Sequence, residues 1–204
     1  MLFDTHAHYD DERFDEDRDA LLASMPENNV GLILNPGCDA ETSRKAVSYA
    51  NRYPFVYAAV GLHPENIEDG WTQALDEIRT LAQSEPRVRA IGEIGLDYYW
   101  EKEERARARQ QVVFARQMEL ARELIAAGRL DGVEIDHPRN TPEDRAELTR
   151  LAKENGLIVT GGTDYHGINT VTPRPVGAFT TGDEMIARIG DIAKARKSTY
   201  KRQK

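Results

Sequence analysis

The chain has 204 residues, of which 40% are hydrophobic and 30% are charged, and its formal net charge is -8. This length fits one domain of ordinary size with a substantial core. The excess of acidic residues excludes a generally basic nucleic-acid binder, because such proteins carry an excess of Lys and Arg. The mean hydropathy is -0.63, and no apolar run approaches the ~18 residues that a membrane span needs.

The first residues of the chain and its single cysteine indicate in which cellular compartment the protein works. The first ten residues hold two histidines and no apolar stretch of signal length, so we expect no secretory signal. The single cysteine, Cys38, excludes an internal disulfide and fits a reducing compartment. Because Cys38 follows Gly37 at the end of a predicted strand, we expect a small buried residue there rather than a nucleophile. These features predict a soluble, cytoplasmic protein.

Short apolar runs alternate with longer amphipathic ones along the chain. Strands are predicted, in chain order, at Leu2–Thr5, Val30–Leu34, Phe55–Val60, Val88–Ile94, Gly132–Ile135 and Leu157–Thr160. Helices are predicted at Phe14–Met25, Glu41–Arg52, Thr72–Ser84, Glu103–Ala127 and Thr141–Glu154. The strand candidates are rich in Val, Ile and Leu without strict polar alternation, which is typical of parallel strands covered on both faces.

This alternation predicts an α/β fold with a parallel sheet and about six βα units. A full eight-unit barrel usually needs ~250 residues, so we expect either an abbreviated TIM-like barrel or an open sheet. We predict a single domain at residues 1–193, followed by a basic C-terminal tail at residues 194–204. The tail holds six cations and no acids, which indicates either a frayed, solvated terminus or an arm that attracts phosphate or nucleic acid.

All five histidines fall just after the carboxyl end of a predicted strand. They are His6, His8, His63, His137 and His166. The carboxyl ends of parallel strands converge on one face, where α/β proteins build their active sites. Each histidine alone would more often be structural, but their shared placement indicates a functional site.

Three of the predicted site residues have a specific reason to bind metal. His6 and His8 lie two residues apart in an extended strand, so both imidazoles point to the same face and can bind one cation. Glu93 lies inside an apolar run, and a lone buried carboxylate is costly unless a cation or metal partners it. Its two oxygens can bridge two metal ions; the alternative is an acid that is hydrogen-bonded to backbone.

Asp164 and His166 repeat the two-residue spacing within a glycine-rich segment, and both are predicted metal ligands. A metal-bound Asp164 can also accept a proton from an attacking water. We therefore predict Asp164 as a catalytic residue, together with the metal-bridging Glu93. The alternative for Asp164 and His166 is an Asx-type turn with an incidental histidine.

His63 and His137 each precede a proline, which makes the local chain extended. For both, the roles of ligand, substrate contact and structural hydrogen-bond partner stay open. We predict His137 as a metal ligand and His63 as a substrate contact. Arg139 is predicted to hold a phosphate oxygen of the substrate through a bidentate contact.

A set of His, Glu and Asp ligands without cysteine suits Zn²⁺, Mn²⁺, Fe or Ni rather than a thiolate zinc site. We expect one to three divalent ions, with Mg²⁺ also possible for this donor set. The chain has no dinucleotide fingerprint, no phosphate-binding P-loop and no Gly-x-Ser-x-Gly elbow. Their absence argues against dinucleotide enzymes, NTPases and serine hydrolases.

The segment from Met1 to about Leu124 resembles the TatD family of metal-dependent deoxyribonucleases. The resemblance rests on Phe3-Asp4-Thr5-His6-Ala7-His8, Asn35-Pro36-Gly37, Ala59-Val60-Gly61-Leu62-His63-Pro64 and Ile91-Gly92-Glu93-Ile94-Gly95-Leu96-Asp97-Tyr98. It implies a barrel of the metal-dependent hydrolase type in which His6, His8 and Glu93 bind metal and Glu93 bridges two ions.

The segment at about residues 125–190 looks instead like the end of the PHP (polymerase and histidinol phosphatase) phosphoesterases. The matching stretches are Leu130–Pro138, Thr160–Gly167 and Pro175-Val176-Gly177 leading into Thr180-Thr181. That resemblance implies a trinuclear metal site with Asp164 and His166 as ligands. The chain therefore looks like a chimera joined near Glu123–Gly128, without the two histidine strands that the TatD family has there.

Both resemblances imply a metal-dependent hydrolase of phosphoester bonds, a nuclease or a phosphatase. The implied substrates are DNA ends, an oligonucleotide or a phosphorylated small molecule. The alternatives are a folded chimeric scaffold with a partial metal site and little catalysis, and a metal-dependent amide hydrolase. Against the amide hydrolase, Glu93 occupies the place where such enzymes often have a lysine that bridges metals. Missing strands would leave sheet edges exposed, so a homodimer is a further hypothesis.

Overall fold

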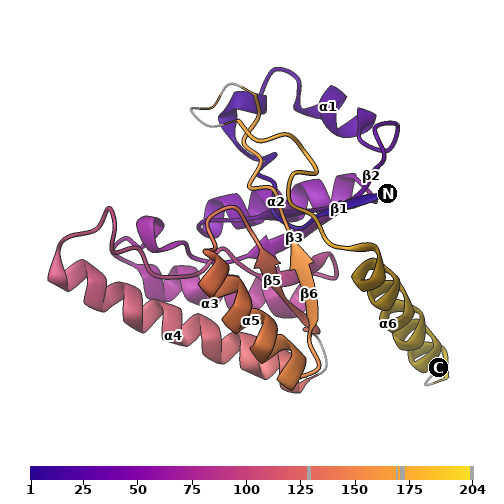
Figure 1. Cartoon of the computed structure of the whole chain (residues 1–204). Coiled ribbons are helices and arrows are strands. Elements are labelled where there is room, and N and C mark those ends of the chain that lie inside the picture. Colours follow the sequence, from indigo (N-terminus) through magenta and orange to yellow (C-terminus); the bar gives the residue numbers. More distant parts are fainter. Residues whose placement is uncertain (128–129, 169, 171–172, 203–204) are drawn as a thin grey trace.

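The computed structural model describes residues 1–127, 130–168, 170 and 173–202, with side chains placed as far as residue 195. Strands and helices alternate through the chain, and Figure 1 follows them from the N-terminus to the C-terminus. The strands are β1 Leu2–Asp4, β2 Val30–Pro36, β3 Val56–Val60, β4 Val88–Ile91, β5 Gly132–Asp136 and β6 Ile158–Gly161. The helices are α1 Arg18–Ser24, α2 Ala40–Arg52, α3 Trp71–Ser84, α4 Glu104–Ala126, α5 Pro142–Glu154 and α6 Asp183–Arg202.

Local capping explains where two of the predicted helices begin. The Asp39 side chain accepts a hydrogen bond from the backbone N–H of Thr42, and the Thr42 side chain bonds back to the Asp39 backbone, so α2 starts on a capping box. Thr141 and Asp144 form the same box at the start of α5. Each box satisfies backbone donors that the first turn of a helix leaves without an intrahelical partner.

Two predicted elements differ from the structure. The helix predicted from Phe14 to Met25 is a short 3-10 turn at Glu12–Phe14 followed by α1. The guanidinium of Arg18 bonds the backbone oxygens of Tyr9 and Asp11, and these bonds hold the intervening chain in a turn rather than a helix. The strand predicted to run to Ile94 ends at Ile91.

At the end of β4 the backbone turns towards the neighbouring strands. The N–H of Gly92 donates to the oxygen of Val60 at 3.0 Å, and the N–H of Glu93 donates to the oxygen of Gly37 at 2.9 Å. These bonds bring Glu93 across the carboxyl ends of β3 and β2 instead of letting β4 continue. A Cβ on Gly61 would lie 2.7 Å from the backbone oxygen of Glu93, so this crossing requires a glycine there.

The strands form two parallel ladders. One has the order β1-β2-β3-β4, and the other pairs β5 with β6. Backbone bonds join the two ladders between β1 and β6: the N–H of Thr5 donates to the oxygen of Gly161 at 3.2 Å, and Ala7 forms an isolated parallel bridge with Tyr165. Among the described residues, no ladder joins β4 to β5.

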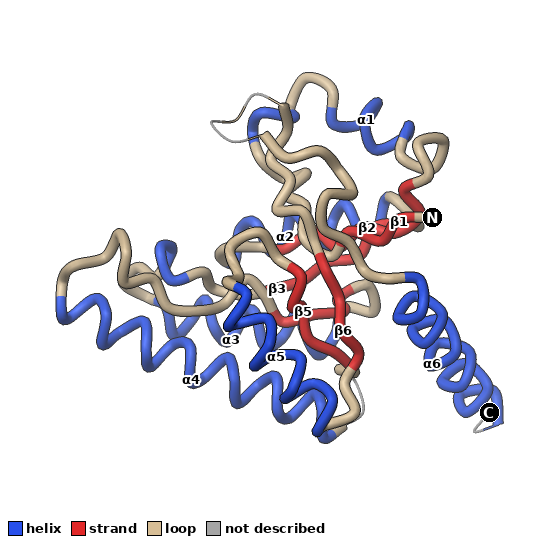
Figure 2. The backbone as a smooth tube through the Cα atoms, viewed as in Figure 1, coloured by secondary structure: helices blue, strands red, loops and turns tan. Residues whose placement is uncertain are grey.

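Six βα units around a parallel sheet confirm the predicted abbreviated barrel. The strands gather in the middle of the molecule with the helices around them (Figure 2). The core between β2, β3 and α4 contains Ile33, Val56, Val60, Val113 and Leu120, each no more than 1% exposed. This packing fixes the strand ends that carry the predicted site.

Helix α6 has no counterpart among the predicted elements. It begins at Asp183 and continues to Arg202, so the basic segment predicted as a tail is helical over most of its length, and residues 203–204 lie outside the described residues. Ile186 and Ile189 of α6 pack against a small cluster of Phe3, Leu34 and Ala59. Among the described residues, no helix combines the length and the apolar content that crossing a membrane requires.

Candidate metal centre

The structure brings all six predicted metal ligands together at the carboxyl ends of the strands. His6 and His8 follow β1, Glu93 follows β4, His137 follows β5, and Asp164 and His166 follow β6. Their ligand atoms form three overlapping groups, each within 4.8 Å: His6, His8 and Glu93; His6, His137 and Asp164; His8, Asp164 and His166. His6, His8 and Asp164 are shared between groups, which makes one continuous cluster.

The first group is the most compact. The Nε2 atoms of His6 and His8 lie 3.2 Å apart. Oε1 of Glu93 lies 3.3 Å from Nε2 of His6, and Oε2 lies 3.4 Å from Nε2 of His8. Each carboxylate oxygen thus faces one of the two imidazoles, so both ring nitrogens and the carboxylate converge where one ion could bind.

Asp164 closes the cluster from the β6 side. Its Oδ1 lies 3.8 Å from Nε2 of both His6 and His8 and 3.5 Å from Nδ1 of His166. Asp164 has a φ of 57°, a conformation that non-glycine residues rarely adopt. Its N–H donates to the backbone oxygen of His6 at 2.7 Å, so this conformation is held by the end of β1.

A close backbone approach seats His6 against the β6 end. A Cβ on Gly162 would lie 2.3 Å from both the Cβ and the backbone N of His6. Asp4 reinforces the same junction, because its Oδ1 accepts the N–H of Thr163 at 2.8 Å and that of His6 at 3.0 Å. Burial raises the pKa of Asp4 to about 6 despite these hydrogen bonds.

The donor set and one orphaned atom fit a divalent ion. Nε2 of His137 is buried and has no hydrogen-bond partner among the described residues, although its ring lies 4.7 Å from that of His6 between centroids. A buried polar nitrogen without a partner is costly. A cation among these histidines would satisfy it, and nitrogen and carboxylate donors suit Zn²⁺, Mn²⁺ or Fe.

Burial and charge interactions shift the pKa values of the cluster histidines in opposite directions. Burial alone would lower the pKa of His6, but hydrogen bonds to Glu134 and Glu93 outweigh it and raise that pKa to about 10. Burial, with the charge of His6 nearby, lowers the pKa of His137 to about 4. Burial and His8 also lower the pKa of His166. Neutral imidazoles such as those of His137 and His166 are the form that ligates a metal.

Glu93 is held as a carboxylate. Its burial alone would raise its pKa, but hydrogen bonds and charge interactions with His6 and His8 bring the pKa well below the usual range. Cys38 is half-buried rather than fully buried, and its Sγ lies 3.4 Å from Oε2 of Glu93. Burial and the charge of Glu93 raise the pKa of the Cys38 thiol, which disfavours a thiolate nucleophile.

Sequence reasoning missed two residues at the centre. Oε2 of Glu134, on β5, lies 3.3 Å from Nδ1 of His6. Nη1 of Arg174 lies 3.1 Å from Oδ2 of Asp164. Glu134 sits in the middle of a predicted apolar strand, as Glu93 does, and that shared pattern was the signal that could have found it. Arg174 lies in a segment without a regular pattern, so it carried no such signal.

The two predicted substrate contacts lie in different surroundings. Nε of Arg139 is 3.7 Å from Oδ2 of Asp164, at the edge of the cluster. His63 caps the 3-10 turn at Pro64–Asn66, where its Nδ1 accepts the N–H of Glu65 at 3.3 Å. His63 belongs to none of the three ligand groups formed by the described residues.

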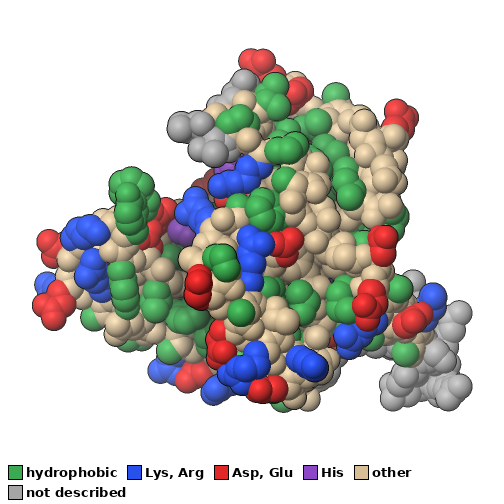
Figure 3. Space-filling view, in the orientation of Figure 1, with side chains coloured by type: hydrophobic (Ala, Val, Ile, Leu, Met, Phe, Trp, Pro, Cys, Tyr) green, Lys and Arg blue, Asp and Glu red, His purple; other side chains and the backbone are tan. Residues whose placement is uncertain are grey.

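The surface around the centre is hollowed. Figure 3 shows histidine side chains at the bottom of a hollow, with Lys and Arg side chains beside it.

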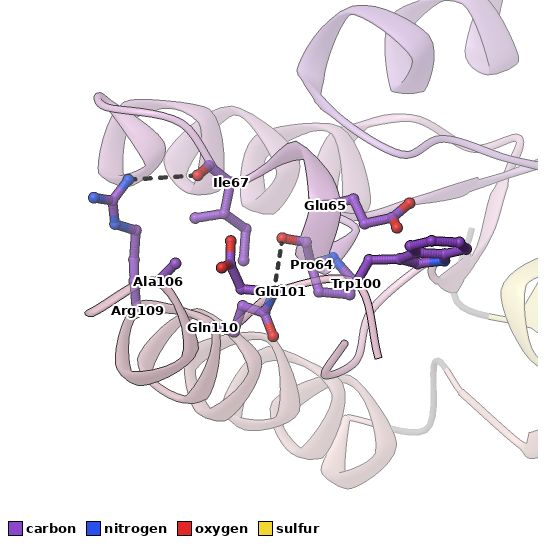
Figure 4. Close-up of a pocket in the computed structure, with 8 residues that line it drawn as sticks. All are labelled: Pro64, Glu65, Ile67, Trp100, Glu101, Ala106, Arg109 and Gln110. Carbon is purple, nitrogen blue, oxygen red and sulfur yellow. Dashed lines mark hydrogen bonds between the residues drawn. The ribbon is translucent and has the colours of Figure 1, made fainter. Parts of the chain in front are cut away.

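The loop that follows Glu93 exposes Tyr99 and Trp100, which are 73% and 69% accessible. Trp100 also forms one wall of a pocket that Arg109 and Gln110 of α4 line from the other side (Figure 4).

Fold and site together define an α/β barrel of the metal-dependent hydrolase type. The profile of the family described as TatD related DNase matches residues 3–159. This stretch is most of the chain, and the chain belongs to that family.

Individual relatives agree with this assignment. The chain is 36% identical over 162 residues to the uncharacterized metal-dependent hydrolase YabD of Bacillus subtilis (strain 168), covering 79% of this chain and 59% of YabD. It is 33% identical over 120 residues to the 3'-5' ssDNA/RNA exonuclease TatD of Cronobacter turicensis, covering 59% of this chain and 44% of that protein. The crystal structure of YjjV, a TatD homologue from Escherichia coli K12, has a TM-score of 0.62 at 23% identity over 94% of this chain and 88% of that one, and shows the same fold.

The extent of these matches corrects one prediction and sets one limit. The prediction that the TatD resemblance ends near Leu124 is wrong, because the family match continues through α5 and into β6. A joint near residues 123–128 has no support in these matches, and Gly128 itself lies outside the described residues. The chain spans about three-fifths of the length of the curated relatives YabD and YjjV, at 59% and 58%.

Proposed function

We propose that this protein is a metal-dependent hydrolase of phosphoester bonds, acting from the cytoplasm on the ends of single-stranded nucleic acid. The observation that carries the proposal is the cluster of His6, His8, Glu93 and Asp164, with two imidazole nitrogens 3.2 Å apart and a carboxylate across both. Membership of the TatD-related DNase family supports the same class of chemistry.

The residues of the cluster have separate tasks in this proposal. His6, His8 and Glu93 would hold one divalent ion, with His137, Asp164 and His166 completing the centre towards β5 and β6. A bound ion supplies Lewis-acid stabilisation of the phosphoryl oxygens and acidifies a water molecule. Asp164 would accept the proton of the attacking water, because its Oδ1 lies within 3.8 Å of a ring nitrogen of His6, His8 and His166, beside the ion that would bind this water.

Two observations favour nucleic acid over other phosphoesters. Relatives named as 3'-5' ssDNA/RNA exonucleases match this chain, and Tyr99 and Trp100 are exposed on the loop that follows Glu93. Exposed aromatic rings serve as stacking platforms for the unpaired bases of single strands. The net charge of -8 argues against tight binding of long duplexes.

The PHP-like ending was predicted for about residues 125–190, and its part beyond residue 159, which the TatD family match does not cover, stays in the proposal. It bears on Asp164 and His166, which lie in the group with His8. A PHP-like ending predicts that both residues are ligands and that the centre takes a third ion. The chemistry would still be phosphoester hydrolysis.

The test begins with elemental analysis of the purified protein. Two or more ions per chain, with phosphodiesterase activity that Glu93→Gln and Asp164→Asn each reduce by about 100-fold or more, would support the proposal. A cooperatively folded protein with one ion or none, and no activity, would favour the alternative of a scaffold with a partial metal site. Unchanged phosphodiesterase rates in both variants would contradict the assignment of these residues.

A homodimer is a separate proposal. Within the described residues, β4 and β5 each have one edge without a strand partner, and such edges pair readily with another chain. Light scattering that gives twice the chain mass of 23.0 kDa would support the dimer. A cooperative monomer would remove it without affecting the proposed chemistry.

A further inference from the structure

Two arginines from separate segments converge on the outer oxygen of Asp164. We propose that Arg139 and Arg174 form a clamp for a terminal phosphate group of the substrate, in preference to an internal phosphodiester. The inference rests on the function proposed above, because it places that phosphate beside the candidate metal centre. It names the chemical group that the site selects.

The geometry separates the two oxygens of Asp164. Oδ1 faces the imidazoles of the cluster, as described above. Oδ2 faces the arginines, with Nη1 of Arg174 at 3.1 Å and Nε of Arg139 at 3.7 Å. Arg139 lies in the loop after β5, and Arg174 lies between β6 and α6. The two guanidinium groups therefore meet at the outer edge of the metal centre.

The exposed fraction of the side chain increases from Asp164 to Arg174 and from there to Arg139. The Asp164 side chain is 6% exposed, that of Arg174 is 27% exposed, and that of Arg139 is 73% exposed. A ligand that approaches from solvent therefore meets the two guanidinium groups before it reaches Asp164. The loop that carries Arg139 is fixed, because Arg145 of α5 bonds both the Asp136 carboxylate at 2.6 Å and the His137 backbone oxygen at 2.8 Å.

The charges at this edge are not balanced within the described residues. Among the residues that the structure describes, Asp164 is the one carboxylate that pairs with Arg139 or Arg174. Each guanidinium has five N–H donors, and a single carboxylate oxygen accepts few of them. One positive charge and most of the donors remain available for another anion. An ion bound by Oδ1 would withdraw more of the Asp164 charge from the arginines.

The available charge matches a terminal phosphate better than an internal one. A phosphate monoester carries about -1.5 to -2 charges near pH 7, whereas an internal phosphodiester carries one. Guanidinium groups bind phosphate oxygens in bidentate pairs, and two of them can hold two faces of one group. A phosphorylated strand end and a phosphorylated small molecule share this chemistry.

The clamp acts on the oxygens that do not react. Hydrolysis forms a bond from the water oxygen to phosphorus, breaks the P–O bond to the alcohol, and transfers a proton from the water, through Asp164, to the departing oxygen. The guanidinium groups gain and lose no proton, since arginine stays protonated in proteins. They hold the non-bridging oxygens, over which negative charge is spread in the transition state.

The test compares two substrates with the same leaving group. Arg174→Met and Arg139→Met are prepared with Mn²⁺, beside the control Arg116→Met, which changes an exposed arginine of α4 that pairs with Glu119. For p-nitrophenyl phosphate we expect each clamp variant to lower kcat/KM by about 10- to 100-fold. For bis(p-nitrophenyl) phosphate we expect a loss of about threefold or less, and the control should change neither rate.

Binding of inorganic phosphate gives a readout that does not depend on turnover. Calorimetry with the Mn²⁺-loaded protein should show the Kd for phosphate rising by about tenfold or more in Arg174→Met, and less in Arg174→Lys, which keeps the charge but loses the planar fork. Metal content by elemental analysis should stay at the wild-type value in both. An unchanged Kd, or an equal loss for monoester and diester, would overturn the clamp.

Two further results separate this inference from the proposed function. If the wild-type protein hydrolyses no phosphoester but binds phosphate in an Arg174-dependent way, the clamp is supported and the hydrolase function fails. If a 5'-phosphorylated single-stranded oligonucleotide is preferred over a phosphorylated sugar, the terminal phosphate belongs to a strand end. The opposite preference would support the clamp with a small-molecule substrate.

Discussion

Oε2 of Glu134 lies 3.3 Å from Nδ1 of His6, while Nε2 of the same imidazole lies 3.3 Å from Oε1 of Glu93. Between these two carboxylates the free His6 imidazole is protonated, with its pKa raised to about 10. If a metal ion replaced the proton on Nε2, the neutral ring would keep its remaining proton on Nδ1, where Glu134 accepts it, and the Nε2 lone pair would face the cluster. Carboxylate–histidine pairs of this kind tune metal sites from outside the ligand set.

This relationship gives the first prediction. Glu134→Ala should weaken metal binding by about 10- to 100-fold, because it removes the acceptor that fixes the tautomer of His6. Glu134→Gln should lose less, since its amide oxygen can still accept the Nδ1 proton. Glu147→Ala is a matched control, because Glu147 is an exposed glutamate of α5 that pairs with Arg150. Zn²⁺ titration against a chelating indicator measures the effect, and equal affinity in all variants would show that Glu134 has no positioning role.

A second prediction concerns the junction of β1 and β6. In Gly162→Ala, the new Cβ would lie 2.3 Å from His6, so the β1 or β6 end must shift. Overpacking of this kind costs about 1–3 kcal/mol, and the shift should also reduce metal affinity. Gly182→Ala is the control, because a Cβ there meets nothing within 4 Å.

The measurement for the glycine pair is thermal unfolding with and without Mn²⁺. Gly182→Ala should leave the Tm within a degree or two, or raise it slightly through the unfolded state. Gly162→Ala should lower the Tm and shrink the stabilisation that Mn²⁺ provides. A Gly162→Ala protein with wild-type Tm and wild-type metal response would show that the junction adapts freely.

The sequence predicted much of this site because strand-end placement is a local property. His6, His8 and Glu93 follow apolar runs that could be recognised as buried parallel strands, and parallel strands share one carboxyl edge. The same argument placed Asp164 and His166, and the ligand atoms of all five meet in the structure.

The features that could not be predicted from the sequence depend on long-range contacts. Arg174 reaches Asp164 through a segment that has no period, and the turn at Glu93 depends on backbone bonds to Gly37 and Val60. Helix α6 was missed for a related reason. Its basic end resembled a solvated tail, and the packing of Ile189 against the Phe3 cluster is visible only in three dimensions.

A third prediction uses the capping box of α5. The Asp144 carboxylate accepts the N–H and the hydroxyl of Thr141, at 3.0 and 2.7 Å, and these bonds lower the pKa of Asp144 from its ordinary value of 3.8. A carboxyl group whose pKa is lower in the folded state than in the unfolded state stabilises the fold at a pH above its unfolded-state pKa. This stabilisation is lost as the pH falls through the folded-state pKa. Asp144→Asn should therefore lower the Tm at pH 7 but have less effect below about pH 3.8.

The pH series needs a control that removes charge from the same turn. Glu143→Gln does so without removing the bonds to Thr141, which Asp144 alone makes in the capping box. Its effect on Tm at pH 7 should be smaller than that of Asp144→Asn. A difference between wild type and Asp144→Asn that stays constant from pH 7 to pH 3 would contradict the linkage.

A fourth prediction tests the exposed loop after Glu93. The N–H groups of Tyr99 and Trp100 donate to Oδ1 of Asp97 at 2.7 and 2.9 Å, which fixes the loop while both rings remain exposed. Lys102 lies 5.6 Å from the centroid of the Tyr99 ring, so a cation accompanies the aromatic surface. Rings with an adjacent cation are what single strands use for stacking and phosphate contact.

Trp100→Ala should raise the KM for a single-stranded oligonucleotide by about 5- to 150-fold, because stacking on one ring contributes about 1–3 kcal/mol per base. The kcat/KM for p-nitrophenyl phosphate should not change, since that substrate has no base to stack. Met118→Ala is the control, because Met118 is a partly exposed apolar side chain of α4. A loss of equal size on both substrates would mean that Trp100 supports the metal centre through the loop and not the binding of a strand.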